Sequence, residues 1–272
     1  MDRTVILAPD MPEVCRLGLA TRGGSGSQPA DIACAIERGV NYLNWCGHPD
    51  GLSRAIAQLG AARSKVVVAV QFQSRNRCEA ASEFEFYLEQ LRTDYIDIAT
   101  LYYVESSAEW DTITAPDGTR KYLQAEKQAG RLRLIGLTTH QRPLAANWAQ
   151  TGLLDMLMVR YNAAHRGAED DLFPVTSPRR IPVVTFTGLR WGALLKPTPD
   201  DPPGFRPPTP ADCYRFCLAN RNVAVALMAP ANRGELENDL KLLEDWRAPT
   251  GAEMVAIRAH GERVRRHAGT FW

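Results

Sequence analysis

The sequence lacks a net charge large enough to select a charged partner. Its 32 lysine and arginine residues nearly balance 31 aspartate and glutamate residues, which leaves a formal charge of +1 at pH 7. Because so small a charge produces no strong surface field, it argues against nucleic acid and an anionic membrane as partners. We expect a small-molecule substrate instead. The oligomeric state is unknown at this point.

Long hydrophobic runs are also absent. The apolar run nearest the N-terminus covers residues 5–8, which is shorter than the apolar region of a secretory signal peptide. No stretch approaches the roughly 20 apolar residues that a membrane helix needs. These two absences predict a soluble protein that stays in the cytoplasm.

Cysteine is scarce and shows no metal-binding spacing. The six cysteines are scattered and form no C-x-x-C pair, so reduced thiols are the expectation in a chain without a secretion signal. Cys213 and Cys217 would share one face of a helix, but no third or fourth ligand is spaced to join them. We therefore predict no metal site.

The glycine-rich phosphate loop of doubly wound sheets is missing. The segment "TRGGSGSQ" (21–28) contains glycines, but it does not match G-x-G-x-x-G, and Pro29 then opens a helix. No acidic residue stands at the end of a second strand to bind a ribose. We interpret this segment as a flexible loop between a strand and a helix.

What the sequence does contain is a repeated alternation of apolar runs and amphipathic segments. Several runs are β-branched and apolar throughout, as expected for strands that are buried on both faces. Eight runs are present: 16–20, 40–44, 66–71, 96–102, 132–137, 154–160, 181–186 and 223–229.

The segments between these runs have helical patterns. Apolar residues in 78–92 form one stripe, and Gly39 and Gly130 stand where a left-handed residue ends a helix. Eight strand–helix units in about 250 residues match the α/β class and a (β/α)8 TIM barrel. No internal repeat or linker interrupts the pattern, so we expect a single domain over residues 1–272.

Three further segments lie outside the repeat. Residues 4–18 predict a short N-terminal β-hairpin that caps the barrel floor. Residues 196–210 contain seven prolines, which predicts an extended loop, either a lid over the catalytic side or a plain connector. The chain ends in a helix and a basic segment, 260–272, whose Phe271 and Trp272 suggest either a lid or a solvated helix end.

Polar and aromatic side chains gather where the predicted strands end, which is where barrels carry their chemistry. They are rich in hydrogen-bond donors and poor in carboxylates, a combination that suits a polar or anionic small ligand. The set includes Asn44, His48, Gln71, Tyr102, Thr138, Thr139, His140, Arg160 and Phe186.

At this point the chain resembles the aldo-keto reductase superfamily over roughly residues 14–247. The resemblance is carried by "RLGLAT", "AIERGVNYLN", "LRTDYIDIATLY", "AGRLRLIGLTTH", "MVRYNAAHRGAE", "IPVVTFTGLRWGALL" and "ELENDLKLLE". It implies an NADP-dependent carbonyl reductase whose Asp, Tyr, Lys and His tetrad stands at the ends of strands two, three and four.

The tetrad is where this sequence departs from the family. Asn44 takes the Asp position, His48 or Pro49 the Tyr position, Gln71 the Lys position and Tyr102 the His position. Because Asn44 and Gln71 carry no charge, they cannot lower a tyrosine pKa by Coulomb interaction. We therefore expect the pKa of Tyr102 to stay near its ordinary value of about 10 unless another group intervenes.

For the cofactor, the resemblance implies NADP or NAD, held by positions that match the family only in part. Thr138 and Thr139 take the places of the Ser–Asn pair that binds the nicotinamide carboxamide, and Arg160 that of its Gln partner. The remaining positions are the aromatic Phe186, with Thr187 and Leu189 after it, and Glu237 and Asn238 at the adenine end. Arg233 is the one basic residue near the expected 2′-phosphate.

Three readings follow for function. The first is a divergent oxidoreductase in which His48, Tyr102 or His140 supplies the proton. The second is a lyase, isomerase or hydrolase on the same barrel, with Arg160 and Arg166 holding an anionic group. The third is a nucleotide-binding pseudoenzyme.

Cys46 and His48 also suggest a thiolate–imidazole dyad, for which a buried, unreactive thiol is the competing interpretation.

Overall fold

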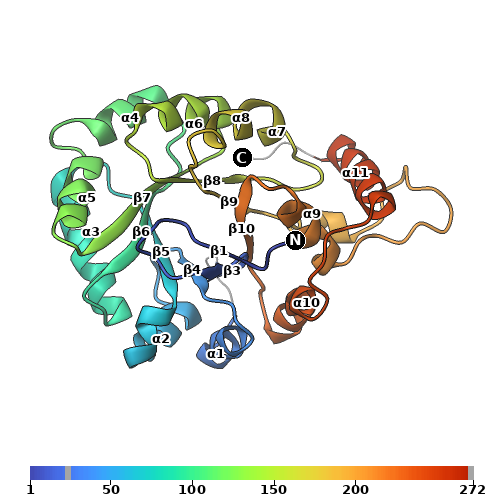
Figure 1. Cartoon of the computed structure of the whole chain (residues 1–272), viewed down its shortest axis with the longest axis horizontal. Helices are drawn as coiled ribbons and strands as arrows, with labels where there is room; N and C mark the ends of the chain where they lie inside the picture. Colours follow the sequence, from blue (N-terminus) through green and yellow to red (C-terminus); the bar gives the residue numbers. More distant parts are fainter. Residues whose placement is uncertain (22–25, 269–272) are drawn as a thin grey trace.

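The computed structural model describes residues 1–21 and 26–268, in which eight parallel strands close into a barrel with helices around it (Figure 1). The strands follow one another around the barrel in chain order, and the last pairs with the first. The predicted (β/α)8 fold is therefore confirmed. The predicted flexible loop falls largely on 22–25, and Phe271 and Trp272 of the predicted tail also lie outside the described residues.

Each predicted run overlaps one barrel strand, and β4, β5 and β7 extend one or two residues past the predicted ends. Tyr102 follows its strand directly rather than belonging to it. The strands are β3 (Leu17–Ala20), β4 (Tyr42–Trp45), β5 (Val67–Phe72), β6 (Ile96–Leu101), β7 (Leu132–Thr139), β8 (Met156–Arg160), β9 (Val183–Phe186) and β10 (Val223–Met228).

Helices connect the strands and bury their apolar sides against the barrel. Gly39 after α1 and Gly130 after α5 have φ values of 95° and 79°, the left-handed conformation expected at helix ends. The helices are α1 (Pro29–Glu37), α2 (Gly51–Ala57), α3 (Arg77–Leu91), α4 (Ser107–Thr114), α5 (Thr119–Gln128), α6 (Arg142–Trp148), α7 (Ala168–Asp171), α8 (Phe173–Thr176), α9 (Pro210–Ala219), α10 (Arg233–Glu244) and α11 (Gly251–Arg266). Three short 3-10 helices add to them: η1 (Gly60–Lys65), η2 (Ala149–Thr151) and η3 (Ala193–Leu195). Within the described ranges, none of the helices has the length and apolar character to cross a membrane.

The predicted hairpin is present and closes the amino-terminal end of the barrel. Strands β1 (Thr4–Val5) and β2 (Val14–Cys15) pair antiparallel. Leu7, Met11 and Val14 pack into the same buried cluster as the inward-facing strand residues. The barrel interior is therefore solid at its floor, and a ligand site can open only at the opposite end.

The proline-rich segment 196–210 is anchored to the C-terminal helix. Asp200 pairs with Arg266, and Asp201 pairs with both Arg263 and the buried His260 on α11. Of this segment, Pro210 is the residue that lines the main cavity described below. These contacts favour the connector over the lid.

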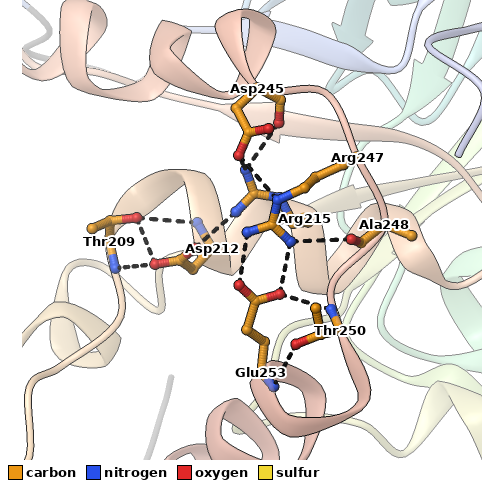
Figure 2. A network of polar contacts seen from close by, with 8 residues as sticks. All are labelled: Thr209, Asp212, Arg215, Asp245, Arg247, Ala248, Thr250 and Glu253. Carbon is orange, nitrogen blue, oxygen red and sulfur yellow. Dashed lines mark hydrogen bonds and ion pairs between the residues drawn. The ribbon is translucent and has the colours of Figure 1, made fainter.

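A network of ion pairs joins α9, α11 and the link before α11 on the outside of the barrel (Figure 2). Arg215, 4% exposed, bonds Asp212 of its own helix and Asp245 at the end of α10. Arg247 pairs with Asp245 and with Glu253 of α11. Because Asp245 binds both arginines, the network fixes the last helices relative to the barrel wall.

Candidate active site

A cavity of about 530 Å³ opens at the carboxyl ends of the strands. This volume lies in the range of roughly 300–1,000 Å³ that is usual for small-molecule sites. The cavity extends from the strand ends past the turn after β9 to α9 and α10. Its walls include Thr21, Asn44, Cys46, His48, Gln71, Tyr102, Tyr103, Met158, Phe186, Thr187, Leu189, Trp191, Tyr214, Asn238 and Asp239.

Four of the five predicted catalytic residues line this cavity. Side chains alternate along a strand, so Asn44 and Gln71 face inward above the inward-facing Tyr42 and Ala69. Tyr102 follows β6 on the same side, and the exposed His48 stands at the rim. The structure therefore brings the uncharged amides, one phenol and one imidazole together at adjacent strand ends.

The expected pKa of Tyr102 is wrong. Burial, and then interaction with the neighbouring Tyr103 hydroxyl, raise the pKa of Tyr102 above its usual value. The two rings lie 4.0 Å apart between centroids. In the low-dielectric mouth the phenolate is poorly solvated, so Tyr102 stays protonated and is a weaker acid than a solvated phenol.

Several buried polar atoms at the mouth accept or donate no hydrogen bond within the described protein. They are Asn44 Oδ1, Thr21 Oγ1 and Thr138 Oγ1. Each atom is buried from solvent. Asn44 and Thr138 lie at the carboxyl ends of β4 and β7, and Thr21 directly follows β3. Orphaned buried polar atoms are rare in folded proteins and mark places where a ligand can supply the missing partner.

The thiol of Cys46 is not an activated nucleophile. Its Sγ donates to the Thr21 carbonyl oxygen at 2.6 Å, and burial, with a contribution from Asp50, raises its pKa to about 11. The thiolate would therefore be scarce at neutral pH. The structure favours the unreactive thiol over a dyad with His48.

His140, the fifth predicted catalytic residue, lies beside the cavity and has a carboxylate partner that the sequence did not reveal. Its Nδ1 is 3.2 Å from Glu105 Oε1, and the same oxygen accepts the His140 backbone N–H at 2.9 Å. The imidazole packs on Tyr103 at 4.6 Å and meets Phe186 edge-on at 5.8 Å between centroids. Burial is the main cause that lowers the pKa of His140, with Glu105 opposing it.

The two predicted carboxamide ligands on β7 differ in orientation. Thr138 continues the inward-facing side that includes Leu134, whereas Thr139 belongs to the outward-facing side with Ile135 and Leu137. The Thr139 hydroxyl accepts the Gln141 backbone N–H at 2.9 Å. Only Thr138 of this pair is positioned toward the mouth.

On β8 the structure places a different residue in the cavity from the one predicted. Met158 lines the cavity, while Arg160 stands two residues further on, on the same side of the strand and beside Phe186. Phe186 at the end of β9 and Thr187 and Leu189 on the turn after it all line the cavity, and their role in cofactor binding stays a prediction. The sequence alone could not decide between Met158 and Arg160, because residues two apart on a strand face the same side.

At the far end of the cavity only one of the three predicted α10 residues forms part of the wall. Asn238 lines the cavity, but Arg233 and Glu237 do not. Arg233 pairs with Glu237 at 2.8 Å and with Asp31 at 3.3 Å, and Glu237 also binds Arg38 at 2.9 Å. Because these charges neutralise one another on the helix surface, neither residue is presented to the cavity.

Asp239, which the sequence did not single out, is the buried carboxyl of this end. It is 3% exposed, and its Oδ2 is 3.4 Å from the Tyr214 hydroxyl. Burial raises the pKa of Asp239 to about 7, against a small opposing effect of Tyr214. No sequence signal distinguishes Asp239 from its neighbours, since its burial depends on how α9 packs on α10.

No metal centre accompanies these groups. Among residues 1–21 and 26–268, no three His, Cys, Asp or Glu side chains gather closely enough to hold a metal ion.

Comparisons with known proteins agree with this architecture. The curated Aldo-keto reductase YhdN of Bacillus subtilis (strain 168) is 22% identical over 207 residues, which cover 67% of this chain and 60% of that protein. Among solved structures, aldo-keto reductase AKR11C1 from Bacillus halodurans in its holo form has a TM-score of 0.73 at 18% identity, covering 93% of this chain and 92% of the other. Glycerol dehydrogenase AKR11B4 from Gluconobacter oxydans has a TM-score of 0.74 at 17% identity, with 99% and 98% covered.

A third solved structure was determined with a cofactor. An aldo-keto reductase from Klebsiella pneumoniae in complex with NADPH has a TM-score of 0.72 at 17% identity, covering 92% of each chain. At such identities the solved structures establish the fold alone. The sequence model of the Aldo/keto reductase family matches residues 27–247. This chain therefore belongs to the aldo/keto reductase family.

Proposed function

We propose that this protein reduces the carbonyl group of a small polar substrate with a nicotinamide cofactor and without the charged proton relay usual in its family. The observation that carries the proposal is the convergence of Asn44, Gln71, Tyr102 and Phe186 on one cavity at the strand ends. Those are the positions where the family keeps its tetrad and its nicotinamide-stacking aromatic. Here they hold two amides, a phenol and a phenyl ring.

The residues present fit a nicotinamide ring at the mouth. Phe186 offers an aromatic face, and the orphaned Asn44 Oδ1 and Thr138 Oγ1 are the kind of partners that a carboxamide or a ribose hydroxyl satisfies. When bound, reduced nicotinamide supplies the hydride. The extension of the cavity to Asn238 leaves room for the rest of a dinucleotide along α10.

Tyr102 is the group we assign to donate the proton to the carbonyl oxygen. It is protonated at neutral pH, since its pKa is raised. General acid catalysis is worth roughly 10² to 10⁴ in rate. A donor with a raised pKa should give slower turnover than the charged relay.

The surface pairing of Arg233 bears on the choice between NADPH and NADH. A 2′-phosphate gains most from a cation that forms charge-assisted bonds with it. Since Arg233 is held by Glu237 and Asp31, we expect the dissociation constants of NADPH and NADH to differ by less than about tenfold, or about 1.4 kcal/mol.

Cofactor fluorescence tests the proposal. Titration of the protein with NADPH and with NADH should give saturable binding, and binding no tighter than millimolar for both would rule the proposal out. In turnover assays, Tyr102→Phe should lower kcat/KM by at least about tenfold. The matched control is Tyr95→Phe, whose phenol contacts Arg63 at the barrel floor and should leave kcat/KM unchanged.

A second candidate rests on the His140–Glu105 pair. A carboxylate-bound imidazole beside Tyr103 is an arrangement suited to acid–base chemistry without redox change, as in a lyase, isomerase or hydrolase. His140→Gln separates the two functions. It should abolish turnover if this candidate is correct, and it should leave both cofactor binding and carbonyl reduction intact if the reductase is correct.

A further inference from the structure

Tyr102 and Tyr103 are consecutive residues, yet both line the cavity. Side chains alternate along a strand, and β6 follows this rule, since Ile98 packs in the inner cluster and Leu101 in the outer one. Continued alternation would point Tyr102 inward and Tyr103 outward. Tyr103 instead has a φ of 45°, and the two rings stack at 4.0 Å between centroids. This left-handed turn brings both phenols to the cavity.

The turn needs support from the rest of the protein. A left-handed backbone is uncommon for a bulky residue such as tyrosine and persists only where the surroundings stabilise it. The Tyr102 backbone N–H donates to the Phe72 carbonyl oxygen at 2.9 Å, and the Val104 backbone N–H donates to that of Thr138 at 3.1 Å. These two bonds use the donor groups of the turn. The carbonyl oxygens of Tyr102 and Tyr103 bind elsewhere.

Arg75, on the loop after β5, binds those carbonyl oxygens. Its Nη2 donates to the Tyr102 oxygen at 2.9 Å and to the Tyr103 oxygen at 3.5 Å. Its Nη1 donates to the carbonyl oxygens of Gln73 at 2.9 Å and Ser74 at 3.4 Å. One guanidinium thus joins the β5 loop to the turn after β6. Arg75 itself is not part of the cavity wall.

The loop that carries Arg75 is fixed by carboxylates of α3. Glu83 accepts the backbone N–H groups of Gln73 and Ser74 at 2.9 and 3.0 Å. Glu79 accepts the Arg75 backbone N–H at 3.4 Å. Because the loop is bonded along its length, it presents the guanidinium from a fixed position.

Arg75 also pairs with Glu109 of α4 at 3.4 Å, where the two side chains are 28% and 38% exposed. An ion pair this exposed contributes little to stability by itself. The other Glu109 oxygen accepts the Glu105 backbone N–H at 2.8 Å, so the pair holds the chain just beyond the turn. The importance of Arg75 therefore lies in its bonds to the turn and not in its charge.

We propose that Arg75 is a positioning residue for the reduction, because it holds the left-handed turn that places the Tyr102 hydroxyl in the cavity. The inference rests on the proposed function and adds a residue that does not touch the substrate. Misplacing a catalytic group by about 1 Å can lower a rate by roughly 10². Without the guanidinium, Tyr103 can relax to an extended backbone and turn outward, which moves Tyr102 with it.

Arg75→Gln removes the guanidinium and leaves a side chain too short to bind both segments. With butanal and glyceraldehyde as substrates, kcat should fall at least about tenfold, whereas the cofactor dissociation constant should change less than about twofold, because Phe186 and Asn238 lie on other elements. Arg120→Gln is the matched control. Arg120 is half-buried on α5, and its Nε donates to the Leu153 carbonyl oxygen at 3.3 Å. The control should keep its kcat, and an unchanged kcat in Arg75→Gln would overturn the proposal.

Tyr103→Asn distinguishes positioning from general destabilisation. Asparagine tolerates the left-handed backbone, so the turn depends less on Arg75. Added to Tyr103→Asn, the Arg75→Gln change should lower kcat by less than about threefold relative to Tyr103→Asn alone. A loss as large as in the wild-type background would contradict the proposal. Arg75→Lys keeps the charge but lacks the fork of donors, so it should recover only part of the rate. Full recovery would assign the effect to charge and overturn the proposal.

Hydrogen exchange separates this proposal from the proposed function, because it needs no turnover. The backbone N–H groups of Val104 and Glu105 are hydrogen-bonded in the intact turn. Their exchange, followed by mass spectrometry of the peptide that spans them, should be at least about tenfold faster in Arg75→Gln and unchanged in Arg120→Gln. If that result is obtained but the wild type reduces no aldehyde, the reductase function fails and Arg75 still holds the turn. If aldehydes are reduced and the exchange is unaffected, the positioning role is refuted and the reductase function stands.

Discussion

Replacing Asp239 by Asn tests how the far end of the cavity is built. Asp239 lies on α10 at the cavity wall, 3% exposed, with the Tyr214 hydroxyl 3.4 Å from its Oδ2. Asparagine has nearly the same shape and can keep an oxygen at that place. It differs in having no charge to bury, so the substitution isolates the cost of ionising this carboxyl.

The magnitude follows from the pKa. Burial raises it from 3.8 to about 7 in the folded protein. Each pKa unit corresponds to about 1.36 kcal/mol, so the full effect has an upper limit of about 4 kcal/mol. The stabilisation is present below the unfolded pKa of about 4 and is lost as pH rises through about 7, because the unfolded chain releases its proton first. Between about pH 5 and about pH 8 we expect a loss on the order of 2 kcal/mol.

Urea denaturation at both pH values measures this loss. The difference in unfolding free energy between the two pH values should be smaller in Asp239→Asn than in the wild type by about 2 kcal/mol. All other titrating groups, His165 among them, contribute equally to both proteins and cancel in the comparison. An identical pH dependence in the two proteins would show that Asp239 is already ionised when folded, which would refute the burial argument.

The remaining predictions concern the mouth and the outer network. Cys46, with its raised pKa, should resist iodoacetamide at neutral pH while the exposed Cys78 is alkylated, as peptide mass spectrometry would reveal; alkylation of Cys46 at an equal rate would contradict this. Arg215→Met should lower the unfolding free energy by about 2–3 kcal/mol, because it removes the buried guanidinium that donates to the Asp212 carboxylate and to both the carbonyl oxygen and the carboxylate of Asp245. Arg247→Met, at a half-exposed position in the same network, should cost less than Arg215→Met, because exposed ion pairs contribute little to stability; equal losses would refute the difference. The reduction rate should show no loss from ionisation of Tyr102 up to about pH 10, since its pKa is raised; a fall in kcat centred below that pH would contradict the assignment.

The fold was largely readable from the sequence because each barrel strand is buried on both faces. Runs such as that of β5, Val67–Phe72, are apolar in nearly every position, and crossover helices of adequate length separate them. The hairpin was recognisable from its turn residues. The anchoring of the 196–210 segment was not, because it depends on ion pairs to α11, more than 50 residues later in the chain.

The site was predictable where a residue directly ends or follows a strand. Asn44, Gln71, Tyr102 and Phe186 all reach the cavity, since strand alternation fixes which side they face. The prediction was least secure for cofactor-binding residues on α10, which follows the last strand instead of ending it. Arg233 pairs with Glu237 four residues later on the same helix and with Asp31 of α1, and the second pairing depends on the packing of α1 on α10.

Groups that owe their chemistry to tertiary environment could not have been found from one sequence. Glu105 gains its importance by contacting His140 across two strand ends. Asp239 becomes unusual only because α9 covers it. In each case the residue type is ordinary and the burial or the partner makes the difference.

The most direct test of the central claim is to follow the hydride. NADPH and NADH carrying deuterium at nicotinamide C4 would be incubated with the protein and a panel of small aldehydes that includes butanal and glyceraldehyde, and the alcohols analysed by mass spectrometry. A cavity that binds the cofactor at Phe186 and donates a proton from Tyr102 predicts a single deuterium in the alcohol, at a rate that Tyr102→Phe lowers. If no aldehyde gave a deuterated alcohol with either deuterated NADPH or deuterated NADH, the result would contradict the account.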